Sequence, residues 1–317
     1  MTTLTGFATP IDLEIFGHPL GDHTWVASDE SGVCWNCLGG GPGYYCGPNR
    51  WKAGHYTPPE GHQICSGNCA VPAARCMGEP QQGSFMGLPS SAGIVYAVNG
   101  VCHQIANRVL YWTGATVDAA AGYWFSSMTF GIWGTTVPAQ ACNPLIVGPV
   151  VAAAALAYEV SVWVDWLSRT TRCTPPSTPA PPDDATHVAR VKALHETVRA
   201  RPPASRGDRL ALHLEEIALT LTHRLGPDFD RARCERVQQL FTDRYATLPT
   251  RLEPPPPAAG AVIDAKGIAQ RFNEDVSGFY STVADALGAA AYQKVFNAVP
   301  GTYVGLINPE SLAGAAG

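Results

Sequence analysis

Apolar residues recur at helical spacing between positions 101 and 111 of the chain. Val101, Ile105 and Val109 follow one another every four residues and form one stripe of a helix. This pattern predicts an amphipathic helix over 101–111, in which Cys102 lies in the first turn. A thiol in that position meets free backbone N–H groups and the positive end of the helix dipole. We therefore expect the thiolate of Cys102 to be favoured over the thiol, as a cysteine nucleophile requires.

Shorter segments before this helix alternate between apolar and polar residues with a period of two. Residues 11–16, 23–27 and 33–36 have that pattern, and turn-forming residues separate them. They predict three antiparallel strands that follow one another along the chain. Residues 116–143 are rich in aromatic residues without a clear period, and we expect short strands and loops there.

Helical periodicity returns in the second half of the chain. It predicts helices over 149–167, 185–200, 207–225, 228–246 and 264–298. Proline-rich segments interrupt these helices, and the charge density rises from 6 Lys and Arg in residues 1–172 to 12 in 173–260. The expected fold class is α+β, with a domain over 1–172 that carries a cysteine-rich insertion (34–76), a linker (173–186), a helical module (187–250), a second linker (251–260) and a helical tail (261–317).

Composition and charge narrow the class of protein. The chain has 317 residues, of which 46% are hydrophobic and 15% are charged, which is enough for a folded core. Its net charge of −5 gives no basic surplus, so we expect no nucleic-acid partner. The apolar run over 145–158 is shorter than the roughly 20 residues of a membrane span. A buried helix and a membrane-inserting segment both stay open for it.

Cysteine is concentrated in one part of the chain. Six of the ten cysteines lie within residues 34–76, a density typical of disulfides or zinc sites. Cys34-x-x-Cys37 matches half of a zinc knuckle, and Cys65-x-x-x-Cys69 matches the other half less well. Disulfides, a zinc site formed by these four cysteines, and free thiols are all open. The main hypothesis includes no metal or other cofactor.

A cysteine nucleophile needs an imidazole within hydrogen-bond reach and a group that orients the imidazole. His103 follows Cys102 directly, but successive helical residues point about 100° apart, so it is not the expected base. His23, at the start of a predicted strand, is expected to face the helix start. Asn36 lies 13 residues later, close to opposite His23 on the neighbouring strand, and is expected to hold its tautomer. Gln104 is expected close enough to the cleft to touch the substrate or its oxyanion.

Two segments carry a resemblance to a known superfamily. Asp22-His23-Thr24-Trp25-Val26 and Val101-Cys102-His103-Gln104 resemble the strand histidine and the helix-starting cysteine of permuted papain-like NlpC/P60 cysteine hydrolases. In the permuted branch the histidine precedes the cysteine, as it does here. The resemblance covers about residues 10–112. It implies a papain-like core of antiparallel strands and a nucleophile-bearing helix, which an all-α C-terminal region follows in this chain.

The resulting hypothesis is cysteine-dependent acyl transfer at an amide bond. The resemblance implies a bacterial peptidoglycan peptide as the substrate and hydrolysis as the outcome. Transglutaminase-like transfer, deamidation and lipid-ester transfer by the same Cys102–His23 site are the alternatives. A different class also fits the pattern, namely a zinc- or disulfide-stapled binding protein in which Cys102 is only a buried, small apolar residue.

The start of the chain and the cysteine cluster indicate where the protein acts. Residues 1–6 contain no basic region followed by an apolar run, so no secretory signal peptide is expected. A disulfide-like cluster without such a signal fits an antibacterial effector secreted by another route, with a cytoplasmic protein as the alternative. We expect a peptide or protein substrate, and an immunity or delivery protein that contacts the helical C-terminal region. Contact with a membrane stays open.

Overall fold

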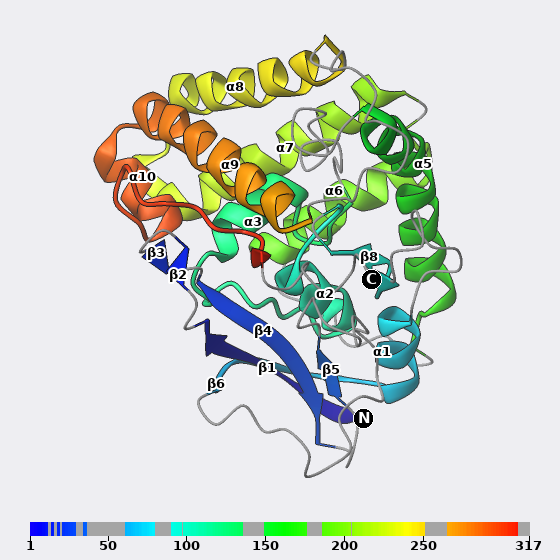
Figure 1. Ribbon diagram of the computed structural model, residues 1–317. Coiled ribbons are helices and arrows are strands. Elements are labelled where there is room, and N and C mark those ends of the chain that lie inside the picture. The colour runs from blue at the N-terminus through cyan, green and yellow to red at the C-terminus, as the bar shows by residue number, and fades with distance from the viewer. Residues whose placement is uncertain are drawn as a thin grey trace.

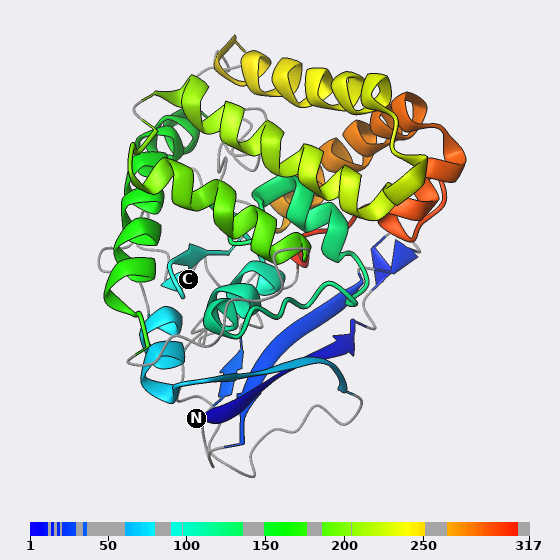
Figure 2. The same ribbon diagram turned by 180° about the vertical axis from the view of Figure 1, so that it is seen from behind.

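The computed structural model describes most of the chain. The described residues are 1–11, 14–15, 18–19, 21–29, 34–36, 61–79, 90–96, 98–135, 149–175, 186–203, 205–250 and 265–309. Within them, small antiparallel sheets combine with a larger number of helical residues, which agrees with the expected α+β class. The main sheet lies at one end of the molecule, and the helices pack together beyond one of its faces (Figure 1, Figure 2).

The main sheet has four antiparallel strands in the order β5-β4-β1-β6. Their bounds are β1 (Thr2–Pro10), β4 (Asp22–Ser28), β5 (Cys34–Asn36) and β6 (His62–Cys69). The predicted strands over 23–27 and 33–36 are confirmed. The predicted strand over 11–16 is wrong in its position, because the strand that pairs with β4 is β1. Of residues 11–16, only the two-residue β2 (Glu14–Ile15), which pairs with β3 (His18–Pro19), is described as a strand.

Strand β1 shows no clear alternation of large apolar and polar residues, because most of its residues that face the core are small. Leu4, Gly6 and Ala8 are buried, whereas the residues between them are only partly buried. A side chain at position 6 is excluded by close packing, since a Cβ built there lies 2.5 Å from the Sγ of Cys65 and 3.1 Å from Val117. Threonine, which favours strands, occupies several of the remaining positions. The sheet can therefore approach the helical layer closely.

The cysteine-rich insertion contributes regular structure to the core. Its residues 62–69 form β6, which pairs with β1, and α1 (Val71–Gly78) follows directly. The hairpin of β7 (Ser90–Ser91) and β8 (Ile94–Val95) then leads toward the next helix. The other residues of the insertion, apart from β5, lie outside the described part of the chain.

Two short helices occupy the middle of the molecule. The helix predicted over 101–111 is confirmed as α2 (Cys102–Val109), and a 3-10 turn (Tyr111–Thr113) follows it. The prediction of short strands and loops over 116–143 is wrong for α3 (Tyr123–Phe130). All eight residues of α3 are buried, so the helix has no polar face and its sequence shows no helical period.

The second half of the described chain contains helices and turns. The helices are α5 (Pro149–Arg172), α6 (His187–Arg199), α7 (Arg206–Leu225), α8 (Arg231–Thr250), α9 (Ala265–Leu287) and α10 (Ala289–Phe296). The predicted helices are confirmed, except that 264–298 is two helices. Gly288, with φ of 81°, separates α9 from α10 in a conformation that glycine adopts easily.

The helical C-terminal region and the sheet-bearing region share one buried core. Residues of β1, α2 and α3 belong to the same apolar cluster as residues of α7 to α10. At the contact, the Tyr280 hydroxyl donates to the Phe125 carbonyl oxygen over 2.8 Å. The rings of Phe125 and Phe296 stack with centroids 4.5 Å apart. The predicted domain boundaries stay a prediction, but the two regions pack as parts of one core.

None of the helices in the described part of the chain, α5 included, is both long enough and apolar enough to span a membrane.

Candidate active site around Cys102

Cys102 is the first residue of α2, where the sequence pattern placed it. Val101 precedes the helix in an extended conformation, and its backbone N–H donates to Oε1 of Gln104 over 3.0 Å. The side chain of Cys102 is buried, with 5% of its surface exposed. Helix α2 packs against β4 (Figure 1). The thiol lies near Thr24 of that strand.

Polar groups of β4 and of the start of α2 lower the pKa of the Cys102 thiol. They are the backbone N–H and the hydroxyl of Thr24 and the backbone N–H groups of Cys102 and His103. Each of them favours the thiolate. The Thr24 hydroxyl is buried and has no hydrogen-bond partner among the described residues. This arrangement is suited to hold a negatively charged sulfur.

Burial nevertheless determines the state of the free thiol. Desolvation of Cys102 is the largest influence and raises its pKa above the ordinary value of 9.0. The Sγ–H points toward the backbone oxygen of Asp22, 4.0 Å away. The expectation that the helix start alone favours the thiolate is therefore wrong for the unliganded protein, because the sheet covers the sulfur and excludes water.

His103 lies closer to the chemistry than its helical position suggested. Its Nε2 is 3.2 Å from the same Asp22 oxygen that the Cys102 thiol approaches, and its Nδ1 is 2.8 Å from Oγ of Ser126. Burial lowers the pKa of His103 to about 4, so the ring is neutral at pH 7. The side chains of Cys102 and His103 therefore both approach the carbonyl oxygen of Asp22.

His23, the expected base, occupies the other face of β4. Thr24 pairs with Ala8 and His23 with Thr9, and successive side chains of a strand point to opposite faces. Because Thr24 faces the thiol, His23 points away from it. The register of β4 therefore places His23 on the face away from Cys102. Whether His23 is the base stays a prediction.

Asn36 was expected close to opposite His23. In β5 it pairs with Trp25, two positions along β4 from His23, which agrees with the predicted offset. Its backbone position is the part of Asn36 that the structure describes. Whether it orients an imidazole therefore stays a prediction.

Gln104 has a structural role in place of the expected contact with substrate. Its Oε1 caps the start of α2, and its Nε2 donates to the Gly131 oxygen over 3.2 Å and to Ser126 Oγ over 3.4 Å. The side chain is fully buried. The expectation is corrected because both ends of the amide are used inside the protein.

The predicted metal ligands do not form a zinc knuckle in the described residues. Cys65 and Cys69 lie on one strand, β6, and Cys34 lies on β5, whereas Cys37 falls outside the described part of the chain. In that part, no group of three or more His, Cys, Asp or Glu side chains gathers as metal ligands do. Burial raises the pKa of Cys65 to about 11, so this thiol stays protonated. The weak zinc hypothesis therefore gains no support here.

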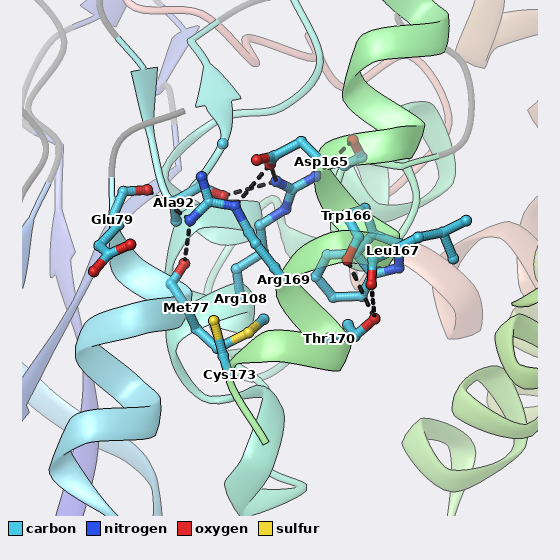
Figure 3. A network of polar contacts seen from close by, with 12 residues as sticks. Met77, Glu79, Ala92, Arg108, Asp165, Trp166, Leu167, Arg169, Thr170 and Cys173 are labelled. Atoms are coloured by element: carbon cyan, nitrogen blue, oxygen red, sulfur yellow. Dashed lines mark hydrogen bonds and ion pairs between the residues drawn. The ribbon is translucent and has the colours of Figure 1, made fainter. Parts of the chain in front are cut away.

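One cysteine of the insertion forms a disulfide with a distant partner. Cys76, in α1, is bonded to Cys173, which directly follows α5 and lies 97 residues later in the chain. Beside it, the Arg169 guanidinium donates to the carbonyl oxygens of Met77 and Glu79, over 3.1 and 2.7 Å, at the end of α1 (Figure 3). The disulfide and the arginine together attach α5 to α1.

A buried ionic network ties the same helix to α2. Arg108 donates to the oxygens of Trp133 and Ala92 over 2.6 and 2.7 Å, and its Nη1 is 3.7 Å from Oδ2 of Asp165. Asp165 also accepts from Nε of Arg169 over 2.7 Å (Figure 3). Both guanidinium groups are fully buried, so the carboxylate between them is needed to balance their charge. The helix that carries Cys102 is therefore held rigidly at its other end.

A pocket lies beside the thiol of Cys102. A small pocket touches Cys102 and His103 and is also lined by Tyr96 and Asn308. It adjoins a cavity of about 520 Å³, and five residues line both: Ile11, Asp22, Gly122, Gly305 and Leu306. The thiol and the imidazole therefore line a small pocket, and the cavity that adjoins it is large enough for a small molecule or a side chain.

Sequence reasoning missed Thr24, Ser126 and the backbone oxygen of Asp22. A signal for Thr24 was present, because it follows the strand histidine and alternation places one of these two neighbours on the inner face. No local pattern indicated Ser126, which lies in the uniformly buried α3. No protein-family model, curated protein sequence or solved structure matches the chain. The geometry around Cys102 is therefore the basis for assigning a function.

Proposed function

We propose that the protein is a cysteine-dependent acyl-transfer enzyme in which Cys102 is the nucleophile. The observation that carries this proposal is that the thiol lies at a helix start, beside polar groups that lower its pKa, in a small pocket that adjoins a larger cavity. A buried, structural cysteine does not need donors that favour its charged form. A nucleophile needs them, because the thiolate is the species that attacks.

The imidazole that the geometry favours is His103. Nε2 of His103 lies 3.2 Å from the Asp22 carbonyl oxygen, to which it can donate, and Nδ1 lies 2.8 Å from Ser126 Oγ. The ring is neutral at pH 7. In the proposed reaction the ring adopts the tautomer in which Nδ1–H donates to Ser126 Oγ, and Nε2 leaves the Asp22 oxygen and takes the thiol proton. The positive charge that forms stabilises the thiolate.

Acyl transfer then proceeds in two steps. The Cys102 thiolate attacks the carbonyl carbon, the bond to the leaving group breaks, and that group departs with the proton held by His103. Water or an amine attacks the resulting thioester, releases the acyl group and returns the proton to the thiol. The backbone N–H groups at the start of α2 stabilise the negative oxygen of the intermediate.

The wider setting of the proposal follows the resemblance to permuted papain-like NlpC/P60 hydrolases. Hydrolysis of an amide bond, in a peptidoglycan peptide or another peptide, is the proposed reaction, with a papain-like core around β4 and α2. The disulfide between Cys76 and Cys173 supports a role in an oxidising compartment, as expected for a secreted antibacterial effector. An immunity or delivery protein would bind the helical C-terminal region.

The test is the rate of Cys102 alkylation by iodoacetamide as a function of pH, followed by mass spectrometry of the digested protein. Replacing His103 with Gln should raise the apparent pKa of the thiol and abolish turnover, whereas His23→Ala should leave both unchanged. His62→Ala, an exposed histidine on β6, is the matched control. If His23→Ala alone shifts the profile, the base is His23, and the arrangement of β4 changes in the active protein.

A second candidate function is a disulfide-stapled binding protein without catalysis. The observations that favour it are the raised pKa of Cys102 and the small exposed area of its side chain. In that case, native Cys102 does not react with iodoacetamide at pH 7 to 9, and Cys102→Ala keeps every activity of the protein. Reaction of Cys102 in the native state excludes this candidate.

A further inference from the structure

The cavity next to Cys102 has an unusually uniform lining. Aromatic rings of Trp124, Phe125 and Phe296 form part of its wall, and most of the other lining residues are Ala, Gly, Val, Leu or Ile. None of the described residues that line it is Lys, Arg or His. The cavity therefore offers apolar contacts and no cation for an anionic ligand.

Among the described lining residues, the carboxylate of Asp22 already has a hydrogen-bond partner. Oδ2 of Asp22 accepts a hydrogen bond from the backbone N–H of Ala121 over 2.8 Å, and the Asp22 N–H donates to the Ala121 oxygen over 3.1 Å. This pair of contacts fixes the turn before α3 against the end of β4. Asp22 thus shapes the cavity, and its negative charge makes an anionic ligand still less favourable.

The opposite wall comes from the C-terminal segment after α10. The side chain of Asn273 holds this segment, since its Oδ1 accepts from the N–H groups of Leu306 and Ile307 over 3.0 Å. Its Nδ2 donates back to the Ile307 oxygen over 2.7 Å. Asn273 is fully buried, and its three hydrogen bonds hold this segment against α9. The C-terminal region therefore completes the site that the N-terminal region begins.

We propose that this cavity binds the apolar part of an acyl group whose carbonyl carbon Cys102 attacks. The inference rests on the proposed function and narrows its substrate class. An uncharged chain or aromatic group gains free energy from leaving water, whereas a carboxylate placed there loses hydration without a compensating partner. Peptides whose acyl part carries a free carboxylate are poor substrates for this site. A fatty acyl group and the acyl part of a hydrophobic amino acid share the required chemistry.

The test uses three chloroacetamides that differ only in the tail on nitrogen: ethyl, octyl and 7-carboxyheptyl. In each reaction the Cys102 sulfur forms a bond to carbon, chloride leaves, and the thiol proton passes to the buffer. The extent of alkylation at Cys102 is measured by mass spectrometry on the full chain. The octyl reagent should react at least about tenfold faster than the ethyl reagent, since each buried CH₂ contributes about 0.8 kcal/mol. The carboxylated tail should lose that advantage.

Two matched variants locate the effect. Ala298 lines the cavity, and Ala298→Trp should abolish the preference for the octyl tail. Ala290→Trp places the same side chain on an exposed position of α10 and should leave both rates unchanged. Equal rates for the ethyl and octyl reagents, or an equal rate for the carboxylated tail, overturn the proposal.

Turnover separates this inference from the proposed function. Hydrolysis of p-nitrophenyl acetate and octanoate, and of leucine p-nitroanilide, shows whether the site performs acyl transfer and which apolar source it accepts. A tail preference in alkylation without turnover of any of the three supports the cavity and contradicts the enzymatic function. Turnover that is equal for acetate and octanoate contradicts the cavity while supporting the enzyme.

Discussion

Removal of the disulfide between Cys76 and Cys173 should destabilise the protein by several kcal/mol. The two cysteines are separated by 97 residues. In the chain-entropy description, a cross-link that closes a loop of this size stabilises the folded state by about 4.7 kcal/mol, because it restricts the unfolded chain. The contacts of Arg169 with the end of α1 remain in the reduced protein, so α1 and α5 should still meet in the native state.

The double variant Cys76→Ser/Cys173→Ser is compared with the wild type by urea unfolding, monitored by tryptophan fluorescence. With an m-value of about 3 kcal/mol/M, the expected loss corresponds to a shift of the midpoint by about 1.6 M. Wild type in a reducing agent should follow the variant. Cys65→Ser, which removes a thiol without a disulfide, is the control and should unfold near the wild-type midpoint. A shift below about 0.4 M in the double variant refutes the reasoning.

Three further predictions concern buried polar groups. Thr24→Val should raise the pKa of Cys102 by about one unit, because a hydrogen bond to a charged group is worth about 1.5 to 3 kcal/mol, and Thr24→Ser should restore the alkylation profile. Burial lowers the pKa of His213 from 6.5 to about 4, so the unfolded chain binds a proton first as the pH falls. The contribution of His213 to stability should be complete above about pH 6.5 and fall by about 3 kcal/mol down to about pH 4. Calorimetry should show a loss smaller by that amount in His213→Phe, and an identical loss contradicts the assignment. Asp165→Asn should lower stability by about 3 kcal/mol in urea unfolding because Arg108 keeps a buried charge without its carboxylate, whereas a change below about 0.5 kcal/mol would show that backbone oxygens alone balance it.

Helices with one polar and one apolar side were predictable from the sequence because their signal is local. The helix of Cys102 and the helices α6 to α8 repeat apolar residues along one stripe, and the structure has all of them. Helix α3 was missed because its aromatic and hydroxyl residues follow no helical period, and β1 was missed because small residues face the core. In both cases the surroundings of an element, and not its own pattern, determine which residues it contains.

Parts of the candidate site could also be predicted from the sequence, and other parts could not. The position of Cys102 at a helix start followed from spacing alone, as did the offset of Asn36 from His23 across two strands. Which side chain of β4 faces α2 depended on the register of β4, since a shift of one residue exchanges the faces of His23 and Thr24. A pattern with a period of two shows that neighbours alternate, but it does not show which of them faces the helix.

By itself, the sequence determined that a cysteine, Cys102, begins a helix and that the chain combines helices with strands. The tertiary structure decided three things: that burial keeps the thiol protonated, that His103 and Thr24 surround it, and that a segment near residue 305 walls its cavity. These properties depend on contacts between residues about 80 to 280 positions apart. Local spacing encodes which face of a helix is apolar, whereas desolvation and hydrogen bonding depend on every element that packs against the site.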